Sequence, residues 1–331
     1  MSLFPGTMRK HPVKFCFLAL CILILSGFEV WRHFYPLPAR EWNTINLKKI
    51  RVADPTNFYF AVFGDNRNSK SVFENLLKLI DHDRDIAFAI DLGDMVNSGN
   101  KTRYRFFLQQ VRNNLAIPLP AGIGKHELRG KGRGLYHDLF GSFYYSFTMG
   151  KNYFIVLDDA NGKGLDLKQK RWLERELTKS GNYGSRIVFM HVPLYDPRGE
   201  NYHHCLPEKS AYNLINLFLK YRITHIFTSH IHGFFAGKWK GIPYAITGGA
   251  GGSLAGDNPD HYYFHFLKVH IKNGNMDVQV IRVPAPYYEH YGPLVYMAWV
   301  YISDFLRFYG IQTVLLLIAG GLALVIYRGE S

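Results

Sequence analysis

Short apolar runs that end in a charged or imidazole side chain recur through the middle of this chain. Four of them occupy residues 58–63, 86–92, 187–190 and 223–227, and the residues that follow them are Gly64-Asp65, Gly93-Asp94, His191 and Ser229-His230. A fifth run, at residues 153–157, has the same apolar character. Runs of this length and composition predict buried β-strands.

The stretches between these runs have the spacing of amphipathic helices. Ser71 and Glu74 show capping-box spacing before an apolar face, a second helix is predicted to begin at Asp166, and a third covers residues 214–219. Residues 244–283 return to a strand pattern with glycine turns. This alternation predicts α/β layers. Polar residues that follow buried strands then gather along one sheet edge, where ligand sites form.

The composition favours anionic partners. The chain has 331 residues, 47% of them hydrophobic, and a formal net charge of +13. Such a charge suits phosphate-bearing substrates or acidic lipid headgroups. The sequence has no helix-turn-helix, finger or RNA-stacking signature, so no nucleic-acid partner is expected. Cys16, Cys21 and Cys205 supply neither a disulfide framework for the soluble part nor a paired-cysteine metal site.

Both ends of the chain are apolar. Residues 15–28 follow Arg9, Lys10 and Lys14, which fits a secretory signal or a signal anchor, and the absence of a convincing cleavage site favours an uncleaved anchor. Residues 311–327 form a second apolar stretch, which we interpret as a spanning helix rather than a buried core helix. With basic residues cytoplasmic at both tips, the middle of the chain would lie on the extracytoplasmic side, periplasmic or extracellular.

These features predict five segments. They are a cytoplasmic tip with an anchor helix at residues 1–31, a linker at 32–54, a soluble domain at 55–285, an aromatic interfacial segment at 286–310 and a transmembrane helix at 311–327. The aromatic segment suits the headgroup boundary, and Asp304 and Arg307 can pair within it on one helix face. The predicted location is therefore the membrane.

Five motifs place ionisable side chains after apolar runs or at turns. They are Gly64-Asp65-Asn66-Arg67, Gly93-Asp94-Met95-Val96-Asn97, Gly124-Lys125-His126-Glu127, His191-Val192-Pro193 and Ser229-His230-Ile231-His232. Singly, a Gly-Asp pair is usually a turn, and a lone histidine is more often a core or surface residue than a ligand. Apart from His126 and Glu127, the motifs together supply two carboxylates and three imidazoles, a ligand set that suits divalent transition metals.

The order and spacing of these motifs resemble the calcineurin-like metallophosphoesterase superfamily, which includes the purple acid phosphatases. The similarity extends from about residue 58 to residue 283 and includes residues 167–177 and 248–251. The resemblance implies an α/β, α+β-type four-layer sandwich, in which two mixed β-sheets pack face to face between helices. One transmembrane helix at each end would complete the predicted fold.

The resemblance also implies a centre with two divalent metal ions, Mn, Fe or Zn. Asp65 and His232 would complete one metal site with Asp94, and His191 and His230 would complete the other with the same Asp94. Two such ions activate a bridging water and brace the entering and leaving oxygens of phosphoryl transfer. His126 matches the histidine that stabilises or protonates the leaving oxygen, and Glu127 would orient its imidazole.

The first and third motifs depart from the family pattern. Arg67 stands where the first motif usually has a histidine ligand, and Asn97 stands where purple acid phosphatases supply a tyrosine. A guanidinium cannot ligate a metal, so Arg67 either clamps a substrate phosphate or packs nearby. Lys125 replaces the asparagine ligand of the second site and must swing away, deprotonate or displace the ion. Asn66, Arg67 and Lys125 are the expected substrate contacts.

Two further segments have alternative interpretations. Residues 128–134 combine basic side chains with glycines and are either a loop that receives an anionic substrate or a solvated surface loop. His203 and His204 form a pair that we interpret as part of a polar surface loop rather than a third metal site.

The predicted function is metal-dependent hydrolysis of a phosphate ester or phosphoanhydride at the membrane surface, with a phosphorylated small molecule or lipid as substrate. The alternative is a catalytically degenerate phosphoesterase domain that acts as a membrane-anchored binding module, and Lys125 is the residue that favours it. A zinc protease is excluded because the sequence has no HExxH spacing.

Overall fold

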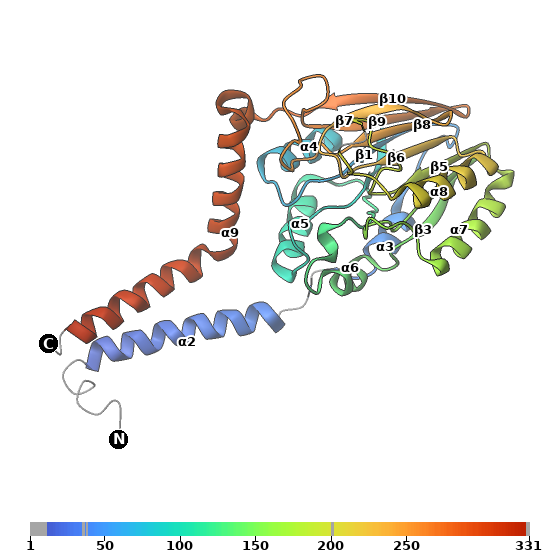
Figure 1. The fold of residues 1–331 in the computed structure, drawn as a ribbon. Coiled ribbons are helices and arrows are strands. Elements are labelled where there is room, and N and C mark those ends of the chain that lie inside the picture. The colour runs from blue at the N-terminus through green and yellow to red at the C-terminus, as the bar shows by residue number, and fades with distance from the viewer. Residues whose placement is uncertain (1–11, 35–36, 38, 200–201, 329–331) are drawn as a thin grey trace. The chain divides into compact units, whose positions relative to one another are not determined.

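A computed structural model describes residues 12–34, 37, 39–199 and 202–328. Arg9 and Lys10, on which the predicted cytoplasmic tip partly rests, lie outside the described residues. The chain divides into two units, one that contains residues 37–293 and one that combines residues 1–36 with residues 294–331. The predicted soluble domain lies within the first unit, which carries both sheets (Figure 1).

The smaller sheet of this unit has four strands in the order β10-β9-β1-β2. Its strands are β1 (Asn57–Phe63), β2 (Ile86–Asp91), β9 (His265–Lys272) and β10 (Asn275–Arg282). β1 pairs with β2 in parallel and with β9 antiparallel, and β9 pairs with β10 antiparallel. The sheet is therefore mixed.

The larger sheet has six strands in the order β3-β4-β5-β6-β8-β7. Its strands are β3 (Tyr145–Met149), β4 (Asn152–Val156), β5 (Ser185–Phe189), β6 (His225–Thr228), β7 (Phe234–Trp239) and β8 (Ile242–Thr247). The four central strands, β4, β5, β6 and β8, run parallel, and the two edge strands pair antiparallel. Because parallel strands end at the same edge, the loops after β5 and β6 emerge together.

The two sheets share one apolar core. Phe60 of β1 is fully buried and packs with Phe88 of β2 in one sheet and with Phe154, Phe189 and Phe227 of the other. Alternation along each strand places every second side chain in this layer. Face-to-face packing of the sheets holds the strand ends, and hence the following loops, in fixed positions.

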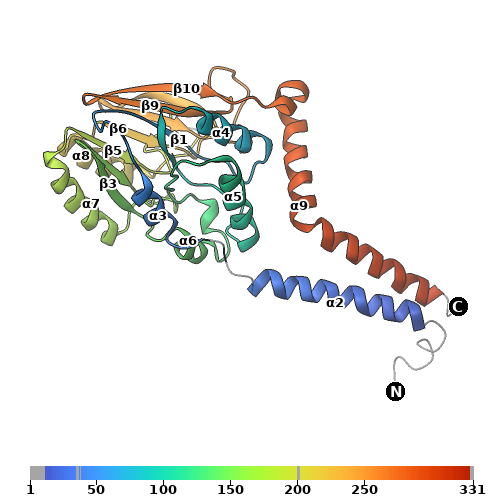
Figure 2. The ribbon, with the colours of Figure 1, turned by 180° about the vertical axis from the view of Figure 1, so that it is seen from behind.

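Helices flank the two sheets (Figure 2). They are α3 (Trp42–Lys49), α4 (Ser71–His82), α5 (Lys101–Asn114), α6 (Gly132–Phe140), α7 (Leu167–Lys179) and α8 (Glu208–Lys220), with short 3₁₀ turns η1 (His126–Leu128) and η2 (Ser180–Asn182). On the smaller sheet, Phe73 of α4 packs between Phe63 of β1 and Phe107 of α5. On the larger sheet, Leu173 of α7 and Phe218 of α8 join the outer core. The α/β sandwich expected from the sequence is confirmed.

The sequence prediction missed three helices and two strands: α3, α5, α6, β3 and β7. Helix α5 has an Asn100 cap whose side chain accepts a hydrogen bond from the Arg103 amide, but its sequence contains few apolar residues. The predicted glycine loop at 128–134 is only partly a loop, because Gly132 and Arg133 begin helix α6. Gly132 packs closely against Gly99 and the Glu127 carbonyl, which accounts for its glycine.

The second unit contains α2 (Pro12–Phe34) and most of α9 (Pro286–Arg328). One helix in the described part of the chain is long and apolar enough to cross a membrane, and its apolar stretch covers residues Leu294–Val325. The apolar stretch of α2, Val13–Phe28, is shorter, so the expected second span at the N-terminus is not evident by this measure. The expected pair on α9 is present, with Arg307 Nη1 3.6 Å from Asp304 Oδ1.

Candidate metal centre

The sheets bring four of the predicted ligands to adjoining strand ends. Asp65 lies two residues beyond β1, Asp94 three beyond β2, His191 two beyond β5 and His230 two beyond β6. Backbone bonds tie the loops to one another: the Asp65 amide donates to the Gly93 carbonyl at 3.0 Å, and the Ser229 amide donates to the His191 carbonyl at 2.9 Å. His232 follows in the turn between β6 and β7.

Several of these residues have a left-handed backbone conformation. The φ angles of Asp65, Asp94 and His230 are 62°, 56° and 69°. This region is unfavourable for residues with a Cβ atom and is concentrated at functional sites, where surrounding structure holds it. The turn at Gly93, with a φ of 98°, brings its backbone so close to Gly124 that a Cβ would collide with it. The backbones of the second and third motifs are therefore in direct contact at Gly93 and Gly124.

The five candidate ligands form two overlapping groups. One contains Asp65, Asp94 and His232, the other contains Asp94, His191 and His230, and in each group the ligand atoms lie within 4.8 Å of one another. We call these the first and second ligand sets. His232 Nε2 lies 3.2 Å from Asp65 Oδ1, and His191 Nε2 lies 3.5 Å from Asp94 Oδ1. Asp94 belongs to both sets, as the sequence predicts.

Backbone carbonyls orient the imidazoles. His191 Nδ1 lies 3.1 Å from the Leu92 carbonyl, His232 Nδ1 lies 2.5 Å from the Ser253 carbonyl, and His126 Nδ1 lies 2.8 Å from the Asn97 carbonyl. A carbonyl accepts only, so Nδ1 carries the proton and Nε2 of the neutral ring is left with its lone pair. This is the tautomer that a metal ligand needs.

Two buried atoms of the sets have no hydrogen-bond partner in the described part of the chain. They are Asp65 Oδ1 and His191 Nε2, one from each set. Buried polar atoms almost always have a partner, and a bound ion is among the few explanations for those that have none within the protein. The donor set, its tautomers and these unpartnered atoms fit a pair of divalent cations.

The protonation equilibria agree with this assignment. Burial, aided by the nearby His191, lowers the pKa of His230 to about 3, so its imidazole is neutral at pH 7. Burial also tends to lower the pKa of His191, but the Asp94 and Asp65 carboxylates outweigh it and raise that pKa. Cations bound between these groups would neutralise the same carboxylates and leave His191 as a neutral ligand.

Glu127 has a different role from the one expected. Its carboxylate accepts hydrogen bonds from the amides of Asp94, Gly124 and Val96, at 2.8, 2.8 and 3.1 Å. The Asn97 carbonyl, rather than Glu127, orients the His126 imidazole. Burial and the Asp94 charge raise the pKa of Glu127 to about 7. Glu127 therefore joins the second and third motifs and positions the Asp94 backbone.

The expected substrate contacts separate into three cases. Asn66 is fully buried, and its amide donates to Asp91 Oδ2 at 3.1 Å, so it supports the loop and is closed to a substrate in this structure. Arg67 is half-buried and its guanidinium contacts His126 Nε2. Lys125 is exposed, although it lies next to His126 in sequence. Only Arg67 and Lys125 are open to a ligand.

The basic residues after the third motif are partly engaged. Arg133 forms a 2.5 Å ion pair with Asp158 and lies over the Phe143 ring. Arg129 is exposed and donates to the Asn97 carbonyl at 3.2 Å, the same carbonyl that orients His126. Arg129 thus remains available beside the centre, whereas Arg133 is held away from it by Asp158.

His204 lies closer to the centre than its sequence context indicates. Its ring centroid is 5.6 Å from that of His230, although His204 is exposed and belongs to neither ligand set. The prediction of an exposed polar loop fits this, but the loop adjoins the metal centre. The His204 amide donates a hydrogen bond to Asp196 Oδ2 at 3.2 Å, and this contact could not be predicted from the sequence.

Comparisons with known proteins agree with the geometry. A family model described as calcineurin-like phosphoesterase matches residues 58–234. A purple acid phosphatase of Glycine max is 28% identical over 134 residues, in a match that covers 34% of this chain and 28% of that protein. The chain therefore spans well under two thirds of this relative.

Solved structures share the fold at low sequence identity. Purple acid phosphatase PPD1 from yellow lupin (Lupinus luteus) seeds has a TM-score of 0.54 and 18% identity, over 69% of this chain and 53% of that one. GAP50, the anchor in the inner membrane complex of Plasmodium, has a TM-score of 0.54 and 15% identity, over 69% of this chain and 85% of that one. A dimetal phosphatase from Danio rerio has a TM-score of 0.53 and 13% identity, over 70% of this chain and 98% of that one. With more than half of its length matched by the family model, the chain belongs to the calcineurin-like phosphoesterase family.

Proposed function

We propose that this chain hydrolyses a phosphate ester or phosphoanhydride at the centre formed by the two ligand sets. The observation that supports it is the pair of overlapping three-residue groups that share Asp94. Asp65 and His232 would hold one divalent ion with Asp94, and His191 and His230 would hold the other. Two ions there would lower the pKa of a shared water and offset charge on the phosphoryl oxygens.

The protein side chains supply binding and proton transfer. A water oxygen forms a bond to phosphorus while the bond from phosphorus to the leaving oxygen breaks. Burial lowers the pKa of His126 to about 4, so its ring is neutral and Nε2 carries a lone pair. His126 Nε2 would take a proton from the attacking water and pass it to the leaving oxygen, so the products are a phosphate and an alcohol or second phosphate. Arg67 would bind a phosphoryl oxygen; its contact with His126 Nε2 would then be released for this proton transfer.

Helix α9 supports a location at the membrane. Its apolar stretch, Leu294–Val325, has 32 residues, and at about 1.5 Å per residue this exceeds the roughly 30 Å of a bilayer core. The excess can lie at the interface, where the aromatic side chains near its start are favourable. We keep the sequence-based assignment of the catalytic unit to the extracytoplasmic side, and of α2 to a second anchor, as proposals.

Metal-dependent turnover tests the proposal. The full-length chain in detergent, supplied with Mn, Fe or Zn, is expected to hydrolyse p-nitrophenyl phosphate or bis-p-nitrophenyl phosphate, and Asp94→Asn should abolish turnover. Elemental analysis should find metal in the wild-type chain. A wild-type protein that neither retains metal nor turns over either ester would refute the proposal.

A second candidate function is a non-catalytic anchor or binding module. Two observations favour it: Lys125 replaces a family ligand, and the fold is similar to that of GAP50, which is described as an anchor. Lys125→Asn separates the two candidates. Activity that appears only in Lys125→Asn indicates a degenerate native site, whereas activity in the wild type indicates a working one.

A further inference from the structure

Two cavities in the unit formed by residues 37–293 are both lined by Tyr262. The first, which we call the proximal cavity, has a volume of about 600 Å³ and is lined in part by Tyr202, Phe235, His261 and Tyr262. The second, the distal cavity, has about 490 Å³ and is lined in part by Tyr262, Phe264, Val283 and Ala285. Volumes of this size are typical of small-molecule sites.

The proximal cavity adjoins the metal centre through its backbone. Ala255 lines it, and the Ala255 amide donates to the His232 carbonyl at 2.9 Å. The Tyr262 ring packs against Gly233, the residue after His232, so closely that a Cβ there would lie 2.9 Å from the ring. His204 and Tyr202 belong to the loop on the same side as His230. A molecule whose phosphate lies at the centre would extend into this cavity.

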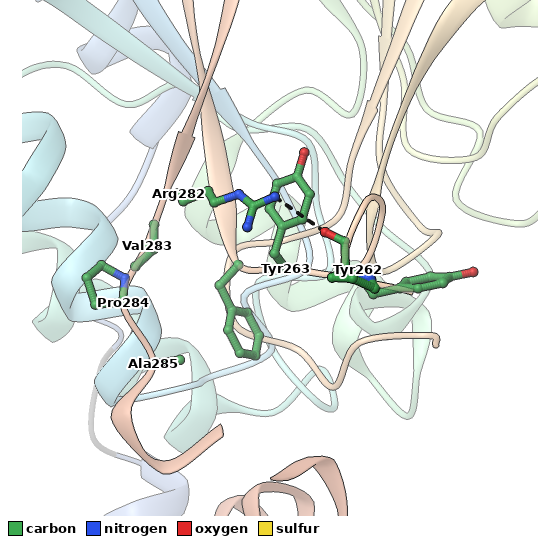
Figure 3. Close-up of a pocket in the computed structure, with 8 residues that line it drawn as sticks. Tyr262, Tyr263, Arg282, Val283, Pro284 and Ala285 are labelled. Carbon is green, nitrogen blue, oxygen red and sulfur yellow. Dashed lines mark hydrogen bonds between the residues drawn. The ribbon is translucent and has the colours of Figure 1, made fainter. Parts of the chain in front are cut away.

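The two cavities differ in polarity. The proximal cavity includes Arg198, Asp257 and Asn258 beside its aromatic rings. Arg198 is already paired with Asp196 at 2.7 Å, whereas Asp257 is an exposed carboxylate, so this cavity is polar. The distal cavity is lined by aromatic and aliphatic side chains together with Arg282 (Figure 3). Polarity therefore falls from the metal centre to the distal cavity.

The distal cavity also adjoins α9 along the chain. Val283, Pro284 and Ala285 form one wall, opposite the Tyr262 ring, and Ala285 directly precedes the first residue of α9 (Figure 3). The apolar stretch begins nine residues later, at Leu294. Exposed Arg282 lies 4.0 Å above the Tyr263 ring and adds positive charge beside the cavity. Such charge suits the anionic surface of a bilayer.

We propose that the substrate is an amphiphilic phosphoester, with its phosphate at the metal centre, its polar linker in the proximal cavity and its hydrocarbon chain in the distal cavity. This inference rests on the proposed function and assigns its substrate class. The polarity gradient matches such a molecule end to end. The distal cavity is the hydrocarbon end of this three-part path, which we call the substrate track, and it is joined along the chain at Ala285 to the helix whose apolar stretch begins at Leu294.

A series of alkyl phosphates tests this inference. The full-length chain is reconstituted in nanodiscs with Mn, and kcat/KM is measured for ethyl phosphate and for octyl phosphate below its micellar concentration. Burial of the longer chain is expected to favour octyl phosphate at least about tenfold. Ala285→Leu, which fills the distal cavity, and Tyr262→Ala should both reduce that ratio. Tyr212→Ala, an exposed tyrosine of α8 that lines neither cavity, should preserve it.

Binding of octylphosphonate, which is not hydrolysed, separates failure of this inference from failure of the proposed function. If octylphosphonate binds more weakly to Ala285→Leu than to the wild type and to Tyr212→Ala, the substrate track is supported even if no ester is turned over. Equal kcat/KM for ethyl and octyl phosphate would refute the substrate track and leave the hydrolase proposal intact. So would a ratio of the two kcat/KM values that is unchanged in both Ala285→Leu and Tyr262→Ala. In a chain without turnover, absence of octylphosphonate binding would overturn it.

Discussion

Each ligand set has a positively charged side chain beside it at a position where the family has a metal ligand, and the two side chains differ in exposure. Arg67, beside the first set, is half-buried and contacts His126. Lys125, at the corresponding position for the second set, is exposed to solvent. Departure from a motif therefore has two different consequences: Arg67 stays in the site as a candidate phosphate ligand, and Lys125 is exposed to solvent.

The largest effect is expected from the residue that both sets share. Asp94→Asn should lower kcat/KM by about a thousandfold or more, because it removes a ligand common to two ions. Metal content should fall in parallel, as measured by elemental analysis. If Asp94→Asn kept two ions per chain, the two sets could not be organised around this carboxylate.

Arg67 should matter for turnover and much less for metal retention. Arg67→Ala is expected to lower kcat/KM about 100-fold through loss of a donor to the phosphoryl group. Arg67→Lys should recover only part of this loss, since an ammonium lacks the planar fork. Kinetics combined with elemental analysis measure both effects. Loss of metal in Arg67→Ala would contradict the difference drawn between the two sets.

A glycine next to the first set provides a test of that set alone. A Cβ at Gly252 would lie 2.7 Å from His232 Cε1, so Gly252→Ala should displace the ring and lower metal affinity about 10- to 100-fold. Gly181→Ala, where a Cβ meets nothing within 4 Å, is the matched control. Metal titration should show one weakened site. Equal weakening of both sites would mean that the sets do not act separately.

Four of the five proposed ligands follow apolar runs, and this pattern made them candidates in the sequence. The runs before Asp65, Asp94, His191 and His230 form strands, and the parallel pairing of β1 with β2 and of β5 with β6 brings these residues to neighbouring strand ends. The role of Glu127 could not be predicted, because its partners are backbone amides that only the folded loops bring close. For the same reason, the contact of Arg67 with His126 has no signal in the sequence.

Helical segments were harder to predict than strands. Helix α5 is rich in polar residues and α6 contains Gly132 and Gly134, so neither shows a strong apolar period. Their stability depends on packing: Phe107 of α5 stacks on Phe73, and Tyr136 of α6 is fully buried. Tertiary contacts of this kind override the local preference.

The smallest effect concerns stability far from both sets. Burial lowers the pKa of His225 to about 4, against about 6.5 in the unfolded chain. The unfolded state then binds the additional proton below pH 6.5, so stability should fall as pH decreases from 6.5 to 4, by on the order of 2 kcal/mol. His225→Phe should flatten this part of the pH profile of the melting temperature. An unchanged slope would assign the effect to other groups.

The location of bound metal tests the central claim most directly. Anomalous diffraction from crystals of the full-length chain grown with Mn should show two peaks on either side of Asp94, one beside Asp65 and His232 and the other beside His191 and His230. A single peak in the first set would mean that Lys125 prevents occupancy of the second. Absence of any peak within bonding distance of Asp94, in crystals of a chain with unaltered fold, would contradict the account.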